Sequence, residues 1–96
     1  MISIIIPAYN EENYIKRTLE SIKQQPYKDY EIIVVLDSCK DNTDKIAKTF
    51  TKKVYKINKM NVSAAENLGA KKAKGDILIF LDADSTISKN LLFEVE

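Results

Sequence analysis

Four short apolar runs, separated by more polar segments, constrain the fold of this chain more than any other feature of its sequence. They cover residues Ile2–Ile6, Tyr30–Leu36, Val54–Ile57 and Ile77–Leu81. Isoleucine and valine dominate the first two, as expected for parallel strands covered on both faces. The third run alternates apolar and polar side chains, so we expect it at an edge of the sheet. Pro7 is expected to end the first strand.

The segments between these runs have helical periodicity. Ile15, Leu19 and Ile22 recur at helical spacing. We expect Asn10 to cap this helix and Pro26 to end it. The other expected helices are a short one behind the capping residues 41–43, an alanine-rich one over Val62–Lys74 that stops at Gly75, and a terminal one carrying Leu91, Leu92 and Val95.

The alternation of strands and helices predicts an α/β fold. We expect a Rossmann-like, mostly parallel sheet in the order βαβαβαβ, followed by a C-terminal helix. Residues 1–96 are treated as one domain, because the chain contains no linker, low-complexity tract or repeat. In such a sheet all loops after strands meet at one rim, where ligands bind. The loops 7–12, 37–42, 58–63 and 82–86 are therefore expected to lie together.

Two carboxylates follow the last apolar run directly, in the segment Asp82-Ala83-Asp84. Paired carboxylates at a strand end suit Mg²⁺ or Mn²⁺ and, through the cation, a diphosphate. The alternative is an ordinary strand end followed by a turn, because Asp is common in turns.

Composition excludes several classes of function. The chain has 96 residues, with fifteen basic and fourteen acidic ones and a net charge of +1, which argues against a nucleic-acid binder. It contains no histidine, which excludes Ser-His-Asp catalysis and His-based zinc sites. Cys39 is the single cysteine, so no disulfide forms within the chain, as is usual in the cytoplasm. No apolar run approaches the roughly 20 residues of a transmembrane segment.

Five segments resemble, in order, the nucleotide-binding half of family 2 glycosyltransferases, which have the A-type glycosyltransferase fold. They are Ile4–Glu12, Glu31–Asp37, Asp41–Thr43, Val62–Gly69 and Ala73–Asp84. The resemblance implies a hexosyltransferase-like activity, in which a sugar passes from a UDP-, GDP- or dTDP-sugar donor to an acceptor hydroxyl. It also implies Mg²⁺ or Mn²⁺ as cofactor, since a divalent cation neutralises the charge of the departing diphosphate.

The resemblance carries over to particular residues. It implies that the donor nucleotide is bound by Pro7, Ala8, Tyr9, Glu11, Asp37 and Asp82. Asp84 matches the principal metal ligand of the DxD motif, and Asp82 is its partner. Two alternatives stay open: Asp37 can cap the amides of Asp41-Asn42, and Tyr9 and Tyr14 can be buried in the core.

Three positions depart from the family's usual pattern. Leu36 stands where a second acid is frequent, Asn61 where Gly is usual, and Glu66 where Arg is usual. An acid in place of a cation is expected to weaken the binding of a polyanionic donor.

The chain ends about twelve residues after Asp84. Members of the family continue with acceptor-binding strands and a later acid that serves as general base. We therefore expect an incomplete domain, with no catalytic base of its own, that is weak or inactive alone. An open sheet edge predicts a homo-oligomer. The expected location is cytoplasmic, with peripheral contact to the membrane in a longer context.

Two other functions are compatible with parts of the sequence. The first is a non-catalytic module for nucleotide binding or assembly, favoured by Glu66 and by the missing half. The second is a haloacid-dehalogenase-like phosphatase, with Asp82 as nucleophile and Asp84 as acid/base. That likeness covers six residues and leaves Pro7–Glu12 unexplained.

Overall fold

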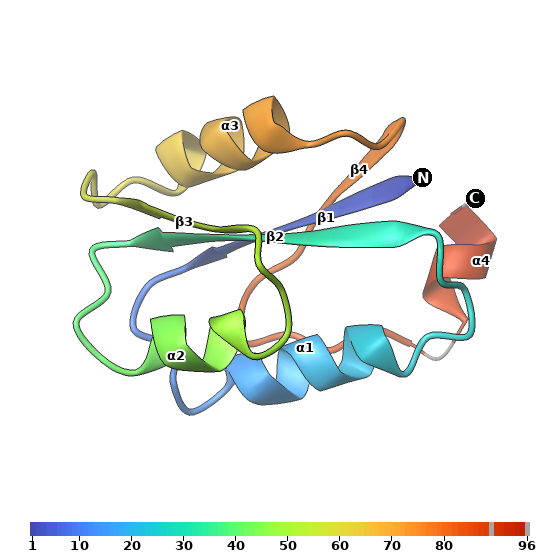
Figure 1. Ribbon diagram of the computed structural model, residues 1–96, viewed down its shortest axis with the longest axis horizontal. Coiled ribbons are helices and arrows are strands. Elements are labelled where there is room, and N and C mark those ends of the chain that lie inside the picture. Colours follow the sequence, from blue (N-terminus) through green and yellow to red (C-terminus); the bar gives the residue numbers. More distant parts are fainter. Residues whose placement is uncertain (89, 96) are drawn as a thin grey trace.

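The computed structural model describes residues 1–88 and 90–95, in which four strands alternate with four helices (Figure 1). In chain order the elements are β1 (Ile2–Ala8), α1 (Ile15–Lys23), β2 (Tyr30–Asp37), α2 (Thr43–Lys48), β3 (Val54–Ile57), α3 (Val62–Lys72), β4 (Ile77–Phe80) and α4 (Leu91–Val95). Within this part of the chain, no helix combines the length and hydrophobicity needed to traverse a lipid bilayer.

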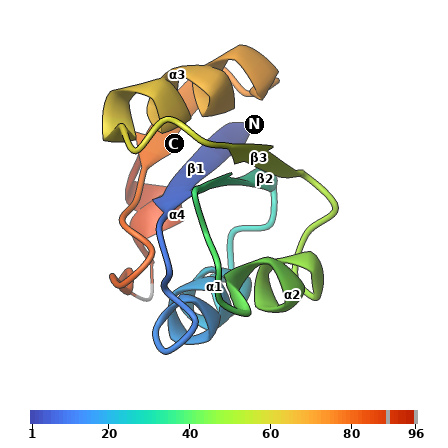
Figure 2. The same ribbon diagram turned by 90° about the vertical axis from the view of Figure 1, so that its left-hand side faces the viewer.

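The strands form one parallel sheet in the order β3-β2-β1-β4. Helix α3 covers one face, and α1 and α2 cover the other (Figures 1 and 2). The predicted α/β fold is confirmed, and β3 lies at an edge as its alternating pattern indicated. All four strands point the same way, so the loops that follow them share one rim.

The two central strands are buried on both faces and supply most of the core. On one face, β1 and β2 pack against Leu19 and Ile22 of α1. On the other face, Ile5 packs against α3 so closely that a Cβ atom on Gly69 would lie 2.3 Å from Ile5 Cγ2. Glycine at position 69 therefore permits the close approach of helix and sheet.

Gly75 was expected to end α3, but the helix ends three residues earlier, at Lys72. The Gly75 N–H donates to Ser3 Oγ at 2.8 Å, and an added Cβ would lie 2.6 Å from the Met1 carbonyl oxygen. Gly75 thus allows the chain to pass close to the start of β1 before it enters β4.

Two expectations for the first loop are wrong. Strand β1 runs through Pro7 to Ala8, because β4 pairs only with Ile2–Ile5 and leaves that side of Pro7 without a strand neighbour. Helix α1 begins at Ile15 with Tyr14 as its N-cap residue. Asn10 instead adopts a left-handed backbone (φ 47°), and its Oδ1 accepts the Lys40 N–H at 2.7 Å.

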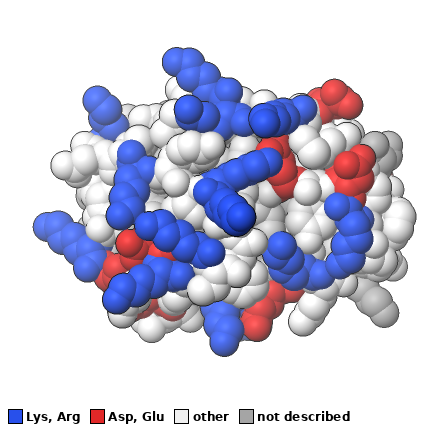
Figure 3. Space-filling model, viewed as in Figure 1, with Lys and Arg blue, Asp and Glu red and all other residues white. Residues whose placement is uncertain are grey.

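Charge is distributed unevenly over this fold. Residues 40–74 carry ten lysines and three acids, a net +7, whereas the rest of the chain has a net −6. Lysine and arginine dominate the face seen in Figure 3, which includes β3 and its neighbours. The small net charge of the whole chain conceals this separation.

Candidate functional site

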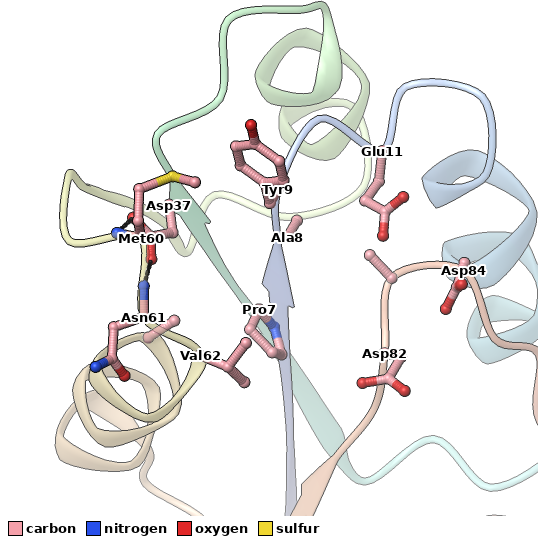
Figure 4. A pocket seen from close by; sticks show the side chains of 12 residues that line it. Pro7, Ala8, Tyr9, Glu11, Asp37, Met60, Asn61, Val62, Asp82 and Asp84 are labelled. Carbon is pink, nitrogen blue, oxygen red and sulfur yellow. Dashed lines mark hydrogen bonds between the residues drawn. The ribbon is translucent and has the colours of Figure 1, made fainter.

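A cleft of about 380 Å³ lies at the carboxyl ends of the strands (Figure 4). All four loops that were expected to meet contribute to it. Its lining residues are Pro7, Ala8, Tyr9, Glu11, Asp37, Met60, Asn61, Val62, Ala65, Asp82, Ala83 and Asp84. The structure therefore brings every residue predicted to bind donor or metal into one cleft, although their separate binding roles stay predictions.

One half of the cleft is acidic. The carboxylates of Glu11, Asp82 and Asp84 lie on one side of it in Figure 4, and both aspartates are exposed. Burial raises the pKa of Glu11, and the negative charges of Asp84, Asp41 and Asp82 raise it further. Among the described residues, none of these three carboxylates is in a salt bridge with a lysine or arginine, so a cation bound beside them would be stabilised.

The acidic half of the cleft offers two carboxylate ligands to a hard cation, which is fewer than a site built from protein ligands alone requires. Among residues 1–88 and 90–95, no group of three or more His, Cys, Asp or Glu side chains is placed to hold a metal ion. Asp82 and Asp84 offer carboxylate oxygen only, which is the ligand that Mg²⁺ and Mn²⁺ prefer. Mg²⁺ commonly takes one or two protein carboxylates and completes its shell with phosphates and water. The pair therefore fits a cation that is shared with a bound diphosphate.

The other half of the cleft is apolar. Tyr9, Met60 and Val62 are large side chains that are all more than half exposed, and they line this half. The alternative that Tyr9 and Tyr14 are core residues is wrong, because both are exposed. Exposed apolar side chains gathered in one concave site are typical of ligand binding.

Asp37 lies beneath this apolar half and is only 6% exposed. Its Oδ1 accepts the N–H groups of Lys59 and Met60, both at 2.9 Å, and its Oδ2 accepts that of Asn61 at 2.7 Å. The Ser38 hydroxyl adds a fourth bond to Oδ1 at 3.0 Å. Burial alone would raise the pKa of Asp37, but these donors outweigh it and the pKa is lowered. Asp37 therefore accepts hydrogen bonds from backbone amides, as the alternative predicted. The amides are those of residues 59–61 and not those of Asp41-Asn42.

The first two loops are joined by reciprocal hydrogen bonds. The Glu12 N–H donates to Asp41 Oδ2 at 3.2 Å, and the Asn42 N–H donates to Glu12 Oε2 at 3.1 Å. The Glu11 N–H donates to Thr43 Oγ1 at 2.9 Å, which places the Glu11 side chain over the cleft. These contacts fix the rim without using the carboxylates of the acidic half.

Three non-glycine residues with positive φ occur in the described chain: Asn10 (47°), Ser38 (61°) and Met60 (48°). Each lies in a loop that follows one of the strands β1, β2 and β3 at the rim. Left-handed backbone is costly for non-glycine residues and is concentrated at functional sites. The strain in this fold is thus gathered around the cleft.

Sequence reasoning did not single out Met60, Val62, Ala65 or Ala83. The loop 58–63 was expected at the rim, but no local pattern tells which of its side chains face inward. Glu66, one helical turn beyond Val62, is half-buried and is not among the lining residues. Its effect on donor binding stays a prediction.

Comparison with known proteins decides the family. The family model of glycosyl transferase family 2 matches residues 3–95. This chain belongs to glycosyltransferase family 2. The match spans nearly the whole chain, and it supersedes the six-residue likeness to phosphatases.

Curated relatives of this family-2 chain are longer proteins. It is 36% identical over 94 residues to glycosyltransferase GlyA of Streptococcus pneumoniae serotype 4, covering 93% of this chain and 14% of that protein. It is 37% identical over 99 residues to the amylovoran biosynthesis glycosyltransferase AmsB of Erwinia amylovora, covering 94% and 33%. The chain therefore spans a third or less of these relatives.

Solved structures share the fold. A crystal structure of S. aureus TarS in complex with UDP-GlcNAc matches with a TM-score of 0.92 and 30% identity, over 98% of this chain and 29% of that one. The mannosyltransferase PcManGT from Pyrobaculum calidifontis, in complex with GDP-Man and Mn²⁺, matches with a TM-score of 0.82 and 24% identity, over 88% and 28%. At that identity the second match shows the fold alone. Together they confirm the expected A-type glycosyltransferase architecture.

Proposed function

We propose that the cleft binds the nucleoside diphosphate of a sugar donor, whose sugar is then transferred to an acceptor hydroxyl. The observation that carries the proposal is the division of one cleft into an apolar half and an acidic half. A nucleoside diphosphate has the matching chemistry, because its base is a flat ring and its diphosphate binds divalent cations. Pro7, Ala8 and Tyr9 contact the base and ribose in this proposal.

The donor class is inferred from the family and from a similar structure that contains a bound nucleotide sugar. TarS was solved with UDP-GlcNAc and is 30% identical to this chain. We therefore infer a UDP-sugar as donor, with GDP- and dTDP-sugars as the alternatives that a binding experiment separates.

Asp84 and Asp82 would hold the divalent cation in this proposal, together with the donor's phosphates. A bound Mg²⁺ or Mn²⁺ supplies Lewis-acid stabilisation of the diphosphate as it leaves. Glu11 adds a third negative charge beside this position, and the amide network of residues 10–12 and 40–43 keeps the loop in place.

We expect this chain to bind the donor but not to catalyse sugar transfer efficiently. The acids of the cleft lie on the donor side, and none is proposed as the general base for an acceptor. Loss of a general base costs about 10²–10⁴-fold in rate. We infer that the 96-residue chain binds donor but transfers sugar slowly or not at all.

Strand β4 forms the second edge of the sheet, and its apolar side chains on the α3 face are uncovered. Leu78 and Phe80 of β4 are 39% and 48% exposed. We infer that the chain forms a homo-oligomer through this edge. Size-exclusion chromatography with light scattering tests this inference, and a monomer at micromolar concentration would contradict it. The cytoplasmic location and peripheral membrane contact stay predictions.

Calorimetric titration with UDP, GDP and dTDP in the presence of Mn²⁺ tests the donor site. We expect UDP to bind most tightly and Asp84→Asn to weaken binding at least about tenfold, since a ligand carboxylate is lost. Asp76→Asn is the matched control, because Asp76 is an exposed carboxylate at the opposite end of the sheet. If no nucleotide binds to the unaltered protein, the donor-site proposal fails and an assembly module becomes the better reading.

A further inference from the structure

Met60 is the most exposed large apolar side chain of the cleft, at 65% of its accessible surface. It lies in the loop between β3 and α3, and Figure 4 shows its side chain directed toward the Tyr9 ring at the same mouth of the cleft. Its backbone is left-handed, with φ 48°. A methionine in this conformation is costly, and glycine or asparagine would be easier to place there.

The backbone of this loop is held from both sides. On one side the Asp37 carboxylate accepts the consecutive N–H groups of Lys59, Met60 and Asn61. On the other side Asn61 caps α3, because its Oδ1 accepts the Ala64 N–H at 3.0 Å. The exposed Met60 side chain thus projects from a fixed backbone.

We propose that Met60 and Tyr9 form one apolar surface against which the base of the donor packs, and that Asp37 is a positioning residue that places Met60 on this surface. The inference rests on the proposed donor site and adds a residue to it. A thioether is polarisable and makes favourable contacts with aromatic rings. Met60 is therefore a binding residue that the local pattern did not reveal.

The hydrogen bonds of Asp37 limit what else it does. Of the four hydrogen bonds that the Asp37 carboxylate accepts, three go to Oδ1. Only Oδ2, which accepts a single bond from Asn61, has room for a further donor.

Hydrophobic contact with Met60 and Tyr9 does not distinguish one base from another. We expect these two residues to contribute to affinity for every nucleoside diphosphate.

Two substitutions of Met60 separate binding from stability. Met60→Ala removes the side chain beyond Cβ, and Met60→Gly also relieves the left-handed backbone. We expect both to weaken UDP binding roughly fivefold, the size of one sulfur–ring contact. The melting temperature of Met60→Gly should not fall. Inorganic pyrophosphate with Mn²⁺ is the probe without a base, and its affinity should stay unchanged in both variants. Phe93→Ala removes an exposed apolar side chain outside the cleft and is the control.

A double-mutant cycle tests the positioning role of Asp37. Asp37→Asn keeps the shape of the side chain but turns a donor group toward the loop amides. We expect it to weaken UDP and GDP by the same factor, and Met60→Ala to add less in this background than in the unaltered protein. A purely structural role for Asp37 would leave the two effects on affinity additive.

The outcomes separate this inference from the donor site itself. If the unaltered protein binds UDP and Asp84→Asn weakens that binding at least about tenfold, but Met60→Ala binds normally, the Met60 inference is wrong and the donor site stands. If the effects of Asp37→Asn and Met60→Ala on UDP affinity are additive, Asp37 is not a positioning residue for Met60. Loss of pyrophosphate binding in Met60→Ala also overturns the inference, because the contact would not be with the base. If no nucleotide binds at all, both proposals fail together.

Discussion

The two ends of the parallel sheet hold their carboxylates in opposite ways. At the amino end, Glu31 of β2 is buried and ion-paired with Lys53, and it accepts hydrogen bonds from Ser3 Oγ at 2.5 Å and from the Lys74 N–H at 2.6 Å. At the carboxyl end, Asp82 and Asp84 are exposed at the mouth of the cleft. At the amino end the carboxylate has hydrogen-bonding and ionic partners within the protein, whereas at the carboxyl end the two carboxylates are accessible from solvent.

The pKa shifts follow the same division. Burial alone would raise the pKa of Glu31, but the bonds from Lys53, Ser3 and Lys74 outweigh it and lower the pKa to about 2. Glu11 at the cleft has the opposite shift, because burial and the neighbouring acids both raise its pKa. Carboxyl groups thus stabilise the fold at the amino end of the sheet, and at the carboxyl end we propose that they bind a ligand. The difference is whether the fold supplies hydrogen-bond donors or a cation for the carboxylate.

Removal of Glu31 should give the largest effect on stability. Glu31→Ala leaves Ser3 Oγ and the Lys74 N–H without their acceptor, and we expect a loss of about 3 kcal/mol in the free energy of unfolding. Urea denaturation measures it. Glu20→Ala on the exposed side of α1 is the control and should change stability by less than about 0.5 kcal/mol. Equal effects of the two variants would mean that the partners of Glu31 do not stabilise the fold.

Lowering the pH should remove the stability that Glu31 contributes. Glu31 has a folded-state pKa of about 2 against an ordinary value of 4.5, so it binds its proton more weakly when folded. Its contribution is complete above pH 4.5 and is lost as the pH falls toward 2. A shift of this size corresponds to up to roughly 3 kcal/mol. Unfolding measured at pH 7, 4 and 2.5 should show the decline, and Glu31→Gln should flatten it. An equally steep decline in Glu31→Gln would assign the acid sensitivity to other groups.

Asp37 is the exception at the carboxyl end, because its charge is satisfied like that of Glu31. Asp37→Asn should therefore cost about 1–2 kcal/mol of stability, as expected for hydrogen bonds to a charged group. Hydrogen exchange of the Met60 and Asn61 amides should become faster in this variant, since their acceptor is changed. If neither stability nor exchange changes, the carboxylate does not hold the loop.

Asp84→Asn should have the smallest effect on stability, and with the opposite sign. It removes one of the charges that raise the pKa of Glu11, so we expect stability to stay equal or to rise by up to about 0.5 kcal/mol. The pKa of Glu11, followed by NMR titration, should move back toward its ordinary value without reaching it, because burial remains. A clear loss of stability would mean that Asp84 has a structural partner and would break the comparison.

The fold was predictable because it depends on patterns within short segments. The runs of isoleucine and valine indicated two-sided burial of β1 and β2, and the alternation in Val54–Ile57 indicated an edge strand. The parallel order of the strands then placed all following loops at one rim. For that reason the sequence predicted that Asp37, Asp82 and Asp84 would meet, although they are far apart along the chain.

The errors came from contacts between distant segments. Asn10 bonds to Lys40 in place of capping its own helix, and Asp37 caps the amides of residues 59–61 in place of those of Asp41-Asn42. Gly75 matters because it passes close to Met1 and Ser3. In each case a local preference, such as helix capping, was outweighed by a partner twenty or more residues away.

Residue types and their order along the chain were enough to specify a parallel α/β sheet, a rim with carboxylates after β4, and membership of glycosyltransferase family 2. Folding in three dimensions settled which of these carboxylates have partners. Glu31 and Asp37 acquire donors from remote segments, whereas Asp82 and Asp84 stay exposed at the cleft. The reason is that burial and hydrogen bonding depend on neighbours in space, which spacing along one segment does not encode.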